Sequence, residues 1–188
     1  YFKCILWFLA FCLFQCYHCF ASDPNGAEIT YRQQDKDTFI VYLIYYIDCN
    51  GVTSTPSYIT EQARCGGLSN NYSLTSLGSY DVTPVSPGQC DACQSSSCSF
   101  KFGIRRYTSE AKVTANYGNC CEFTFSAYLG LRASSISTGS AGKGLYIEAY
   151  MNKCIEKINN SPVFSMPPLT LIQTDVQTNY SYAVTDTA

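Results

Sequence analysis

The side chains best suited to chemistry in this sequence are its twelve cysteine thiols. Four lie within the first 19 residues, and eight follow later in the chain: Cys49, Cys65, Cys90, Cys93, Cys98, Cys120, Cys121 and Cys154. An even set of eight, in a chain rich in tyrosine and poor in charge, is typical of disulfides formed in an oxidising compartment. The spacing leaves their pairing open. We expect the adjacent Cys120 and Cys121 to bond to different partners, because neighbouring side chains diverge on a strand.

Zinc is the alternative chemistry for the cluster Cys90, Cys93 and Cys98. A structural zinc site needs a second pair of ligands, usually histidines or another Cys-x-x-Cys. The only histidine is His18, in the N-terminal segment, and the Cys120-Cys121 pair has the wrong spacing. We therefore predict a disulfide-stapled loop here, with no metal and no other cofactor.

Catalytic groups of other kinds are sparse. Acid–base or nucleophilic catalysis needs a positioned base beside a nucleophile, or paired carboxylates. Asp35 and Asp37 fall in a polar turn, where solvated carboxylates are expected. Thiol exchange by Cys-x-x-Cys normally sits in a βαβ pattern, which the chain lacks. The sequence therefore predicts that the protein is not an enzyme.

Composition narrows the class of protein further. Charged residues make up 14% of the chain, against about 25% in ordinary globular domains. The net charge is −2 and no basic run occurs, so the electrostatic surface of a nucleic-acid binder is absent. The 16 tyrosines, with Ser, Thr and Asn between the apolar runs, are typical of secreted β proteins.

The elements that must position these residues begin with two β-type runs at 28–32 and 38–47, separated by the polar stretch 33–37. The second run is β-branched and aromatic, with no Gly, Pro or charge, and such residues favour a packed pleated surface. Its alternate positions are apolar on both faces. We predict a central strand covered on both sides, with Cys49 anchoring its end.

Further strands are predicted downstream from alternation and β-branched content. The stretch 53–88 is rich in Ser, Thr, Pro, Gly and Asn, and predicts long loops with one or two edge strands, near 57–59 and 73–77. Residues 145–151 fit either a strand or a helical turn. The remaining predicted strands are 99–107, 111–117, 122–131, 163–164, 169–172 and 179–184.

The chain divides into three predicted parts. Residues 1–21 carry one lysine, an apolar run and a small-residue end, which is typical of a secretory signal peptide. A retained apolar helix is the alternative, because this length just spans a bilayer, and membrane contact is expected only in that case. Residues 22–160 predict a disulfide-rich β-sandwich domain, and residues 161–188 predict a linker and the first strands of a second β module.

Three tripeptides match the acceptor for N-linked glycans, at Asn71, Asn159 and Asn179. Such matches also arise by chance in a chain rich in Ser and Asn. Glycans are expected there only if the host carries out this modification.

Several short segments together resemble the N-terminal region of large secreted surface proteins of gliding bacteria, which use type IX secretion and a gliding-motility-associated C-terminal domain. These segments are GAEITY at 26–31, YIDCNG at 46–51, GIRRY at 103–107, the Cys-Cys pair, YIEA at 146–149, NSPVF at 160–164 and YAVTD at 182–186. The resemblance implies an Ig-like or PKD-like β-sandwich and no catalytic residues. Ala27 and Ile47 depart from the family's Gly and Arg, and cysteine is more frequent here, which leaves a divergent fibre or appendage subunit open.

Together these observations predict an all-β, Ig-like or PKD-like, disulfide-stapled β-sandwich that is secreted and located at the cell surface. The expected function is that of an extracellular structural or adhesive protein, as the subunit of a filament or tubular appendage. A carbohydrate- or ligand-binding module of a surface protein is the alternative. The expected partners are copies of the same chain, forming a homopolymer, and glycans, with no nucleic acid.

Overall fold

The computed structural model describes residues 24–49, 55–83, 103–132, 143–155 and 158–166, together with positions 139, 175, 177, 179–181 and 183–186. The predicted signal-like segment 1–21, the cysteines Cys90, Cys93 and Cys98, and the predicted strand 169–172 lie outside the described residues. No helix of the described part has the length and apolar character needed to cross a membrane.

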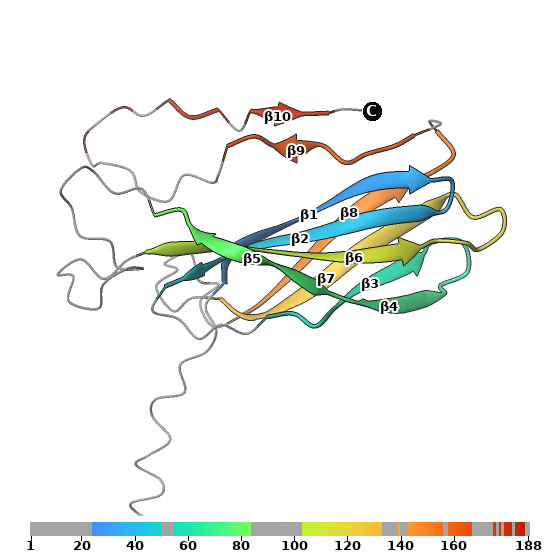
Figure 1. The fold of residues 1–188 in the computed structure, drawn as a ribbon, viewed down its shortest axis with the longest axis horizontal. Helices are drawn as coiled ribbons and strands as arrows, with labels where there is room; N and C mark the ends of the chain where they lie inside the picture. The colour runs from blue at the N-terminus through green and yellow to red at the C-terminus, as the bar shows by residue number, and fades with distance from the viewer. Residues whose placement is uncertain are drawn as a thin grey trace, which may run out of the picture.

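Two four-stranded antiparallel sheets pack face to face (Figure 1). Sheet A has the order β1 (Pro24–Asp35), β2 (Thr38–Asp48), β6 (Ile104–Thr114), β5 (Thr75–Asp81). Sheet B has the order β4 (Ser69–Ser73), β3 (Tyr58–Ala63), β7 (Glu122–Leu131), β8 (Gly144–Asn152). This confirms the predicted all-β sandwich. Its distribution of strands between the two sheets is that of Ig-like domains.

The core lies between the sheets and is built largely on β2. Alternate residues of β2 point inward and are almost fully buried: Phe39, Val41, Leu43, Tyr45 and Ile47. Phe39 meets Phe125 of β7 at 6.1 Å between ring centroids, and Tyr45 stacks on Tyr107 of β6 at 5.2 Å. The predicted inner position of β2 is confirmed, since it pairs with β1 on one side and β6 on the other.

A third element closes one side of the sandwich. The short ribbon of β9 (Val163–Phe164) and β10 (Val184–Thr185) lies beyond β1 (Figure 1). The chain reaches it through residues 159–161, which bond to the open edge of β1. The Tyr31 amide donates to Ser161 Oγ at 2.8 Å, and the Ser161 amide donates to the Tyr31 carbonyl at 2.9 Å. This contact blocks part of an edge that would otherwise be free to pair with another chain.

Three strand predictions were wrong in detail. Residues 53–88 hold three strands rather than loops with edge strands, and β3 is an inner strand paired with β4 and β7. Residues 104–114 form one strand instead of two segments, because β2 and β5 hydrogen-bond both of its sides. The predicted strand 179–184 is replaced by the two-residue β10. By contrast, 122–131 has the predicted bounds, and the ambiguous 145–151 is strand β8.

Candidate binding face and its disulfide frame

The described cysteines are structural. Cys65 bonds to Cys120 and Cys121 bonds to Cys154, with Cα–Cα distances of 5.6 and 5.4 Å. Adjacent cysteines thus have different partners, as expected from their divergent side chains. Cys65 follows β3, the Cys120-Cys121 pair precedes β7, and Cys154 follows β8, so the two bonds fasten three neighbouring strands of sheet B at one end. Cys49 is also disulfide-bonded.

The outer face of sheet B carries four large exposed aromatic side chains. Tyr58, Tyr128, Tyr146 and Tyr150 are each between 47% and 64% exposed. Tyr128 of β7 is directly opposite Tyr146 of β8. Thr60 of β3 is opposite Ser126, and continuing that antiparallel register by two residues places Tyr58 level with Tyr128. Three adjacent strands therefore present a row of tyrosines, and Tyr150 lies four residues beyond Tyr146.

Gly144 determines how Tyr128 lies. A Cβ atom at position 144 would overlap the ring and hydroxyl of Tyr128, so the ring occupies the space above the bare glycine backbone. The register of β7 and β8 shifts between Leu129 and Leu131, beside this contact. The ring is thus held across the strands, and one side of it remains exposed to solvent.

A polar hollow of about 300 Å³ opens beside the tyrosine row. It is lined by Gln62, Ala63, Arg64, Gly67, Thr124 and Glu148. Arg64 lies 5.6 Å from the ring centroid of Tyr150, and the Tyr146 hydroxyl donates to Glu148 at 3.0 Å. These contacts link the hollow to the aromatic row. We call this surface, made of the four tyrosines and the hollow, the tyrosine face.

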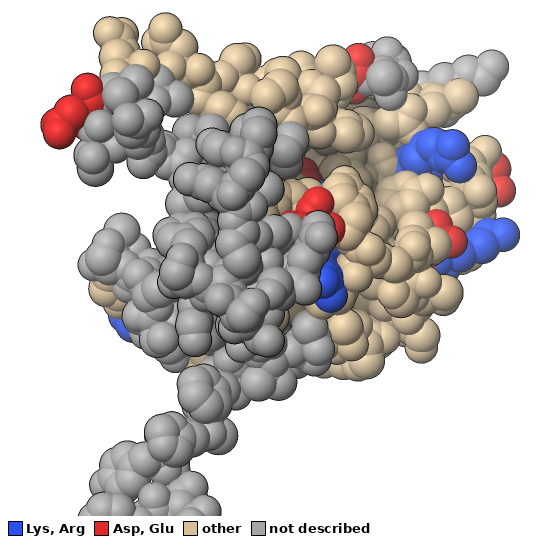
Figure 2. Space-filling model, turned by 60° about the vertical axis from the view of Figure 1, so that its left-hand side comes forward, with Lys and Arg blue, Asp and Glu red and all other residues tan. Residues whose placement is uncertain are grey.

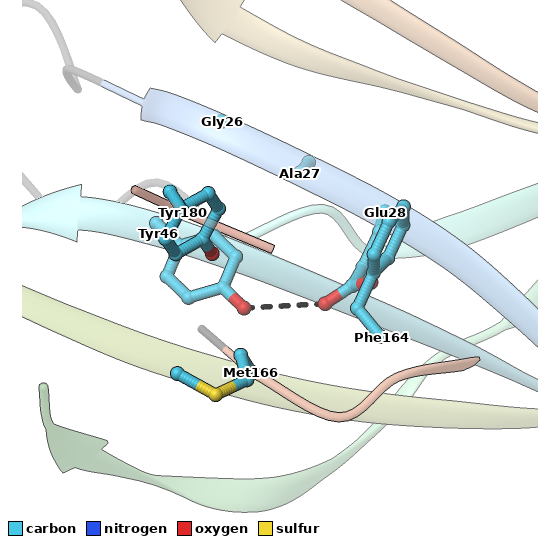
Figure 3. Close-up of a pocket in the computed structure, with 7 residues that line it drawn as sticks. All are labelled: Gly26, Ala27, Glu28, Tyr46, Phe164, Met166 and Tyr180. Carbon is cyan, nitrogen blue, oxygen red and sulfur yellow. Dashed lines mark hydrogen bonds between the residues drawn. The ribbon is translucent and has the colours of Figure 1, made fainter. Parts of the chain in front are cut away.

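The outer face of sheet A is different, because the β9–β10 ribbon lies against part of it. A cavity of about 190 Å³ remains between them, lined by Gly26, Ala27, Glu28, Tyr46, Phe164, Met166 and Tyr180 (Figure 3). The Tyr46 hydroxyl donates to Glu28 at 3.2 Å. Burial raises the pKa of Glu28, although the Tyr46 hydrogen bond and the charge of Arg106 oppose the shift. Burial, and then the charge of Glu28, raise the pKa of Tyr46 to about 12.

A second polar cluster lies inside the sandwich. Glu61 of β3 is fully buried, and its Oε2 accepts a hydrogen bond from the Tyr117 hydroxyl at 2.7 Å. Its Oε1 has no hydrogen-bond partner among the described residues. Lys153 lies nearby, bonded to Asp37 at 2.5 Å and to the Ala115 carbonyl at 2.9 Å. Burial raises the pKa of Glu61. The cluster ties the ends of several strands together and is not open to a ligand.

The surface charge fits a binding role better than a charged catalytic cleft. Figure 2 shows blue and red atoms in small separate groups on a mostly tan surface. Within the described ranges, no group of three or more His, Cys, Asp or Glu side chains is placed to hold a metal ion.

The three glycan acceptors have different surroundings. Asn71 is exposed on β4, at the rim of sheet B, and accepts a hydrogen bond from the Thr60 hydroxyl at 2.8 Å. Asn179 is exposed. Asn159 uses its side-chain amide to donate to the Asn152 carbonyl at 2.9 Å, and Ser161 is buried against β1. The Asn159 tripeptide therefore serves the fold, and a glycan there would break its hydrogen bond.

Sequence reasoning did not find the tyrosine face. The alternation of Tyr146, Glu148 and Tyr150 with apolar residues does mark an exposed side of β8. The register that brings Tyr58 and Tyr128 alongside comes only from strand pairing. Both the tyrosine row and the two disulfides belong to one object, an all-β sandwich stapled by disulfides. Comparison with protein-family models, with curated proteins and with solved structures gives no match.

Proposed function

We propose that this chain is an extracellular adhesive module, and that it binds its target through the tyrosine face. The observation that carries the proposal is the row of half-exposed tyrosines on an uncovered sheet, beside a polar hollow. Tyrosine gives a large contact area at low conformational cost and has a hydroxyl for hydrogen bonding, so it is frequent in binding surfaces. Isolated exposed aromatics need no explanation, but a contiguous patch indicates an interaction site.

The chemistry of the face favours carbohydrate as the ligand class. Tyrosine rings offer flat apolar surfaces against which the C–H faces of a sugar ring can pack. The hollow supplies a guanidinium donor from Arg64, a carboxylate acceptor from Glu148 and an amide from Gln62, which together suit neighbouring hydroxyl groups. A flat sheet suits an extended glycan better than a small enclosed substrate.

Secretion and a surface location form part of the same proposal. Their support is the signal-like pattern of residues 1–21 and the disulfides, which are typical of oxidising compartments. The resemblance to exported β-sandwich proteins of gliding bacteria points in the same direction and remains a proposal.

A glycan array probed with the labelled full chain tests the ligand class. We expect binding to a family of related oligosaccharides, and loss of that binding when Tyr146→Ala is used. Tyr80→Ala is the matched control, because Tyr80 is equally exposed but lies on β5 of the other sheet. An array with no bound glycan, or equal loss with both variants, would rule out carbohydrate binding at this face.

Self-assembly into a homopolymer is the second candidate function, and one observation favours it. The edge strand β5 exposes Leu77 and Tyr80, and exposed apolar edge strands pair readily with other chains. Light scattering at rising protein concentration tests this candidate. Leu77→Lys should suppress assembly, whereas Tyr146→Ala should not. A chain that remains monomeric at high concentration would argue against it.

A further inference from the structure

We propose that the cavity between sheet A and the β9–β10 ribbon is a second binding site, and that it takes a small organic cation such as an alkylammonium group. This site is separate from the tyrosine face, which belongs to sheet B. The cavity floor is formed by Gly26, Ala27 and Glu28 of β1 with Tyr46 of β2, and Phe164 and Met166 lie across from it (Figure 3).

The first argument is the placement of a carboxyl group in a mostly apolar cavity. Glu28 directs one oxygen to the Tyr46 hydroxyl, 3.2 Å away. A carboxylate removed from water is costly unless a positive charge or several hydrogen bonds compensate it. A structural role in holding Tyr46 would be met equally well by a neutral glutamine. The acidic group is therefore better explained by a positively charged occupant.

The nearest protein cation compensates Glu28 only in part. Arg106 lies on β6, directly opposite Tyr46 in the sheet and one strand further from Glu28. Its guanidinium sits 5.3 Å from the ring centroid of Tyr80 and donates to the Thr108 hydroxyl at 3.0 Å. These contacts direct its charge toward β5, away from the cavity.

The second argument is the aromatic lining. Tyr46, Phe164 and Tyr180 all border the cavity. The faces of aromatic rings carry partial negative charge and attract ammonium groups, and cages of such rings are a common way to bind quaternary ammonium ligands. Met166 adds a polarisable thioether that adapts to the shape of a ligand. A carboxylate together with three rings favours an organic cation over a neutral apolar molecule or a hydrated metal ion.

The size of the cavity sets the size of the ligand. Its volume of about 190 Å³ corresponds to roughly six water-sized groups, at about 30 Å³ each. Tetramethylammonium and the trimethylammonium end of choline are of this size. A Cβ at Gly26 would meet no atom within 4 Å, so a larger side chain there would extend into open space without disturbing the strand.

The two methionines of the chain provide a direct assay. Met166 lines the cavity, whereas Met151 is buried in the core and serves as an internal reference. In full-length protein with ¹³C-labelled methionine methyl groups, tetramethylammonium and choline should shift the Met166 signal in a saturable way and leave Met151 unchanged. The neutral choline isostere 3,3-dimethylbutan-1-ol should bind at least tenfold more weakly.

Three variants complete the test. Glu28→Gln keeps the hydrogen bond to Tyr46 and should weaken choline binding at least tenfold, with little effect on the neutral isostere. Gly26→Val should abolish binding by filling the cavity while every lining group stays in place. Val163→Ala lies on the same ribbon but outside the lining, and should bind as wild type. Equal binding of choline and its isostere, or no saturable Met166 shift in a folded wild-type protein, would overturn the proposal.

Discussion

Removal of the Cys121–Cys154 disulfide should lower the free energy of unfolding by about 2–4 kcal/mol. The bond closes a loop of 33 residues, for which chain entropy in the unfolded state gives roughly 3.7 kcal/mol. Measured values usually fall below this limit because the unfolded chain keeps some structure. Both cysteines lie toward the surface, so their replacement leaves little cavity, and the loss should come mainly from the open loop.

The variant for this test is the double replacement Cys121→Ala with Cys154→Ala. A single replacement would leave a free thiol next to Cys120 that can attack the Cys65–Cys120 bond, and the double variant avoids such exchange. Urea denaturation, followed by circular dichroism without reductant, gives the free energy of unfolding. In a chain of this size the expected loss lowers the melting temperature by about 4–16 °C.

The matched control is Cys65→Ala with Cys120→Ala. This bond closes a longer loop, of 55 residues, and Cys120 is buried in the core, so its removal should cost more than the removal of the first bond. If the Cys121–Cys154 variant unfolds within 0.5 kcal/mol of wild type, the bond does not constrain the unfolded chain and the frame described here for sheet B is wrong.

Three further predictions follow from single contacts. Because burial raises the pKa of Glu61 above 4.5, its protonated form adds stability that is complete below about pH 4.5 and is lost as pH rises through the folded-state pKa; Glu61→Gln should therefore gain stability over wild type at pH 8 but not at pH 4, and an equal difference at both would contradict the assignment. Gly144→Ala should turn the Tyr128 ring away and reduce ligand binding while changing stability by less than about 1 kcal/mol; unchanged affinity would show that the ring position does not matter. Ser161→Ala leaves the buried Tyr31 amide without its acceptor and should cost about 1–3 kcal/mol, seen as faster hydrogen exchange at that amide; wild-type protection there would refute the edge contact.

The sequence predicts most of this fold where one strand is determined by its own residues. β2 is uniformly apolar and β7 is bounded by a turn and a bulge, and both were located correctly. β3 and β6 were misjudged because polar residues occur within them. Glu61 is turned into the core of β3, and Ser109 is buried on β6, where pairing on both sides outweighs weak local preference.

The candidate sites were not predictable from the sequence for a different reason. The tyrosine face depends on the register between β3, β7 and β8, and a shift of one residue would move each tyrosine to the opposite side of the sheet. The cavity on sheet A joins Glu28 to Phe164, which are far apart in the chain and brought together only by tertiary packing. Composition indicated many tyrosines, but it gave no sign of which ones would share a surface.

The affinity ratio of two tyrosine variants is the most direct test of the proposed adhesive function. With an oligosaccharide identified on the array, the dissociation constants of wild type, Tyr128→Ala and Tyr80→Ala would be measured by calorimetry, after matching melting curves show that all three are folded. We expect Tyr128→Ala to bind at least tenfold more weakly, a loss of about 1.4 kcal/mol, and Tyr80→Ala to bind as wild type. Equal affinity of all three proteins would contradict the proposal that the tyrosine face is the binding surface.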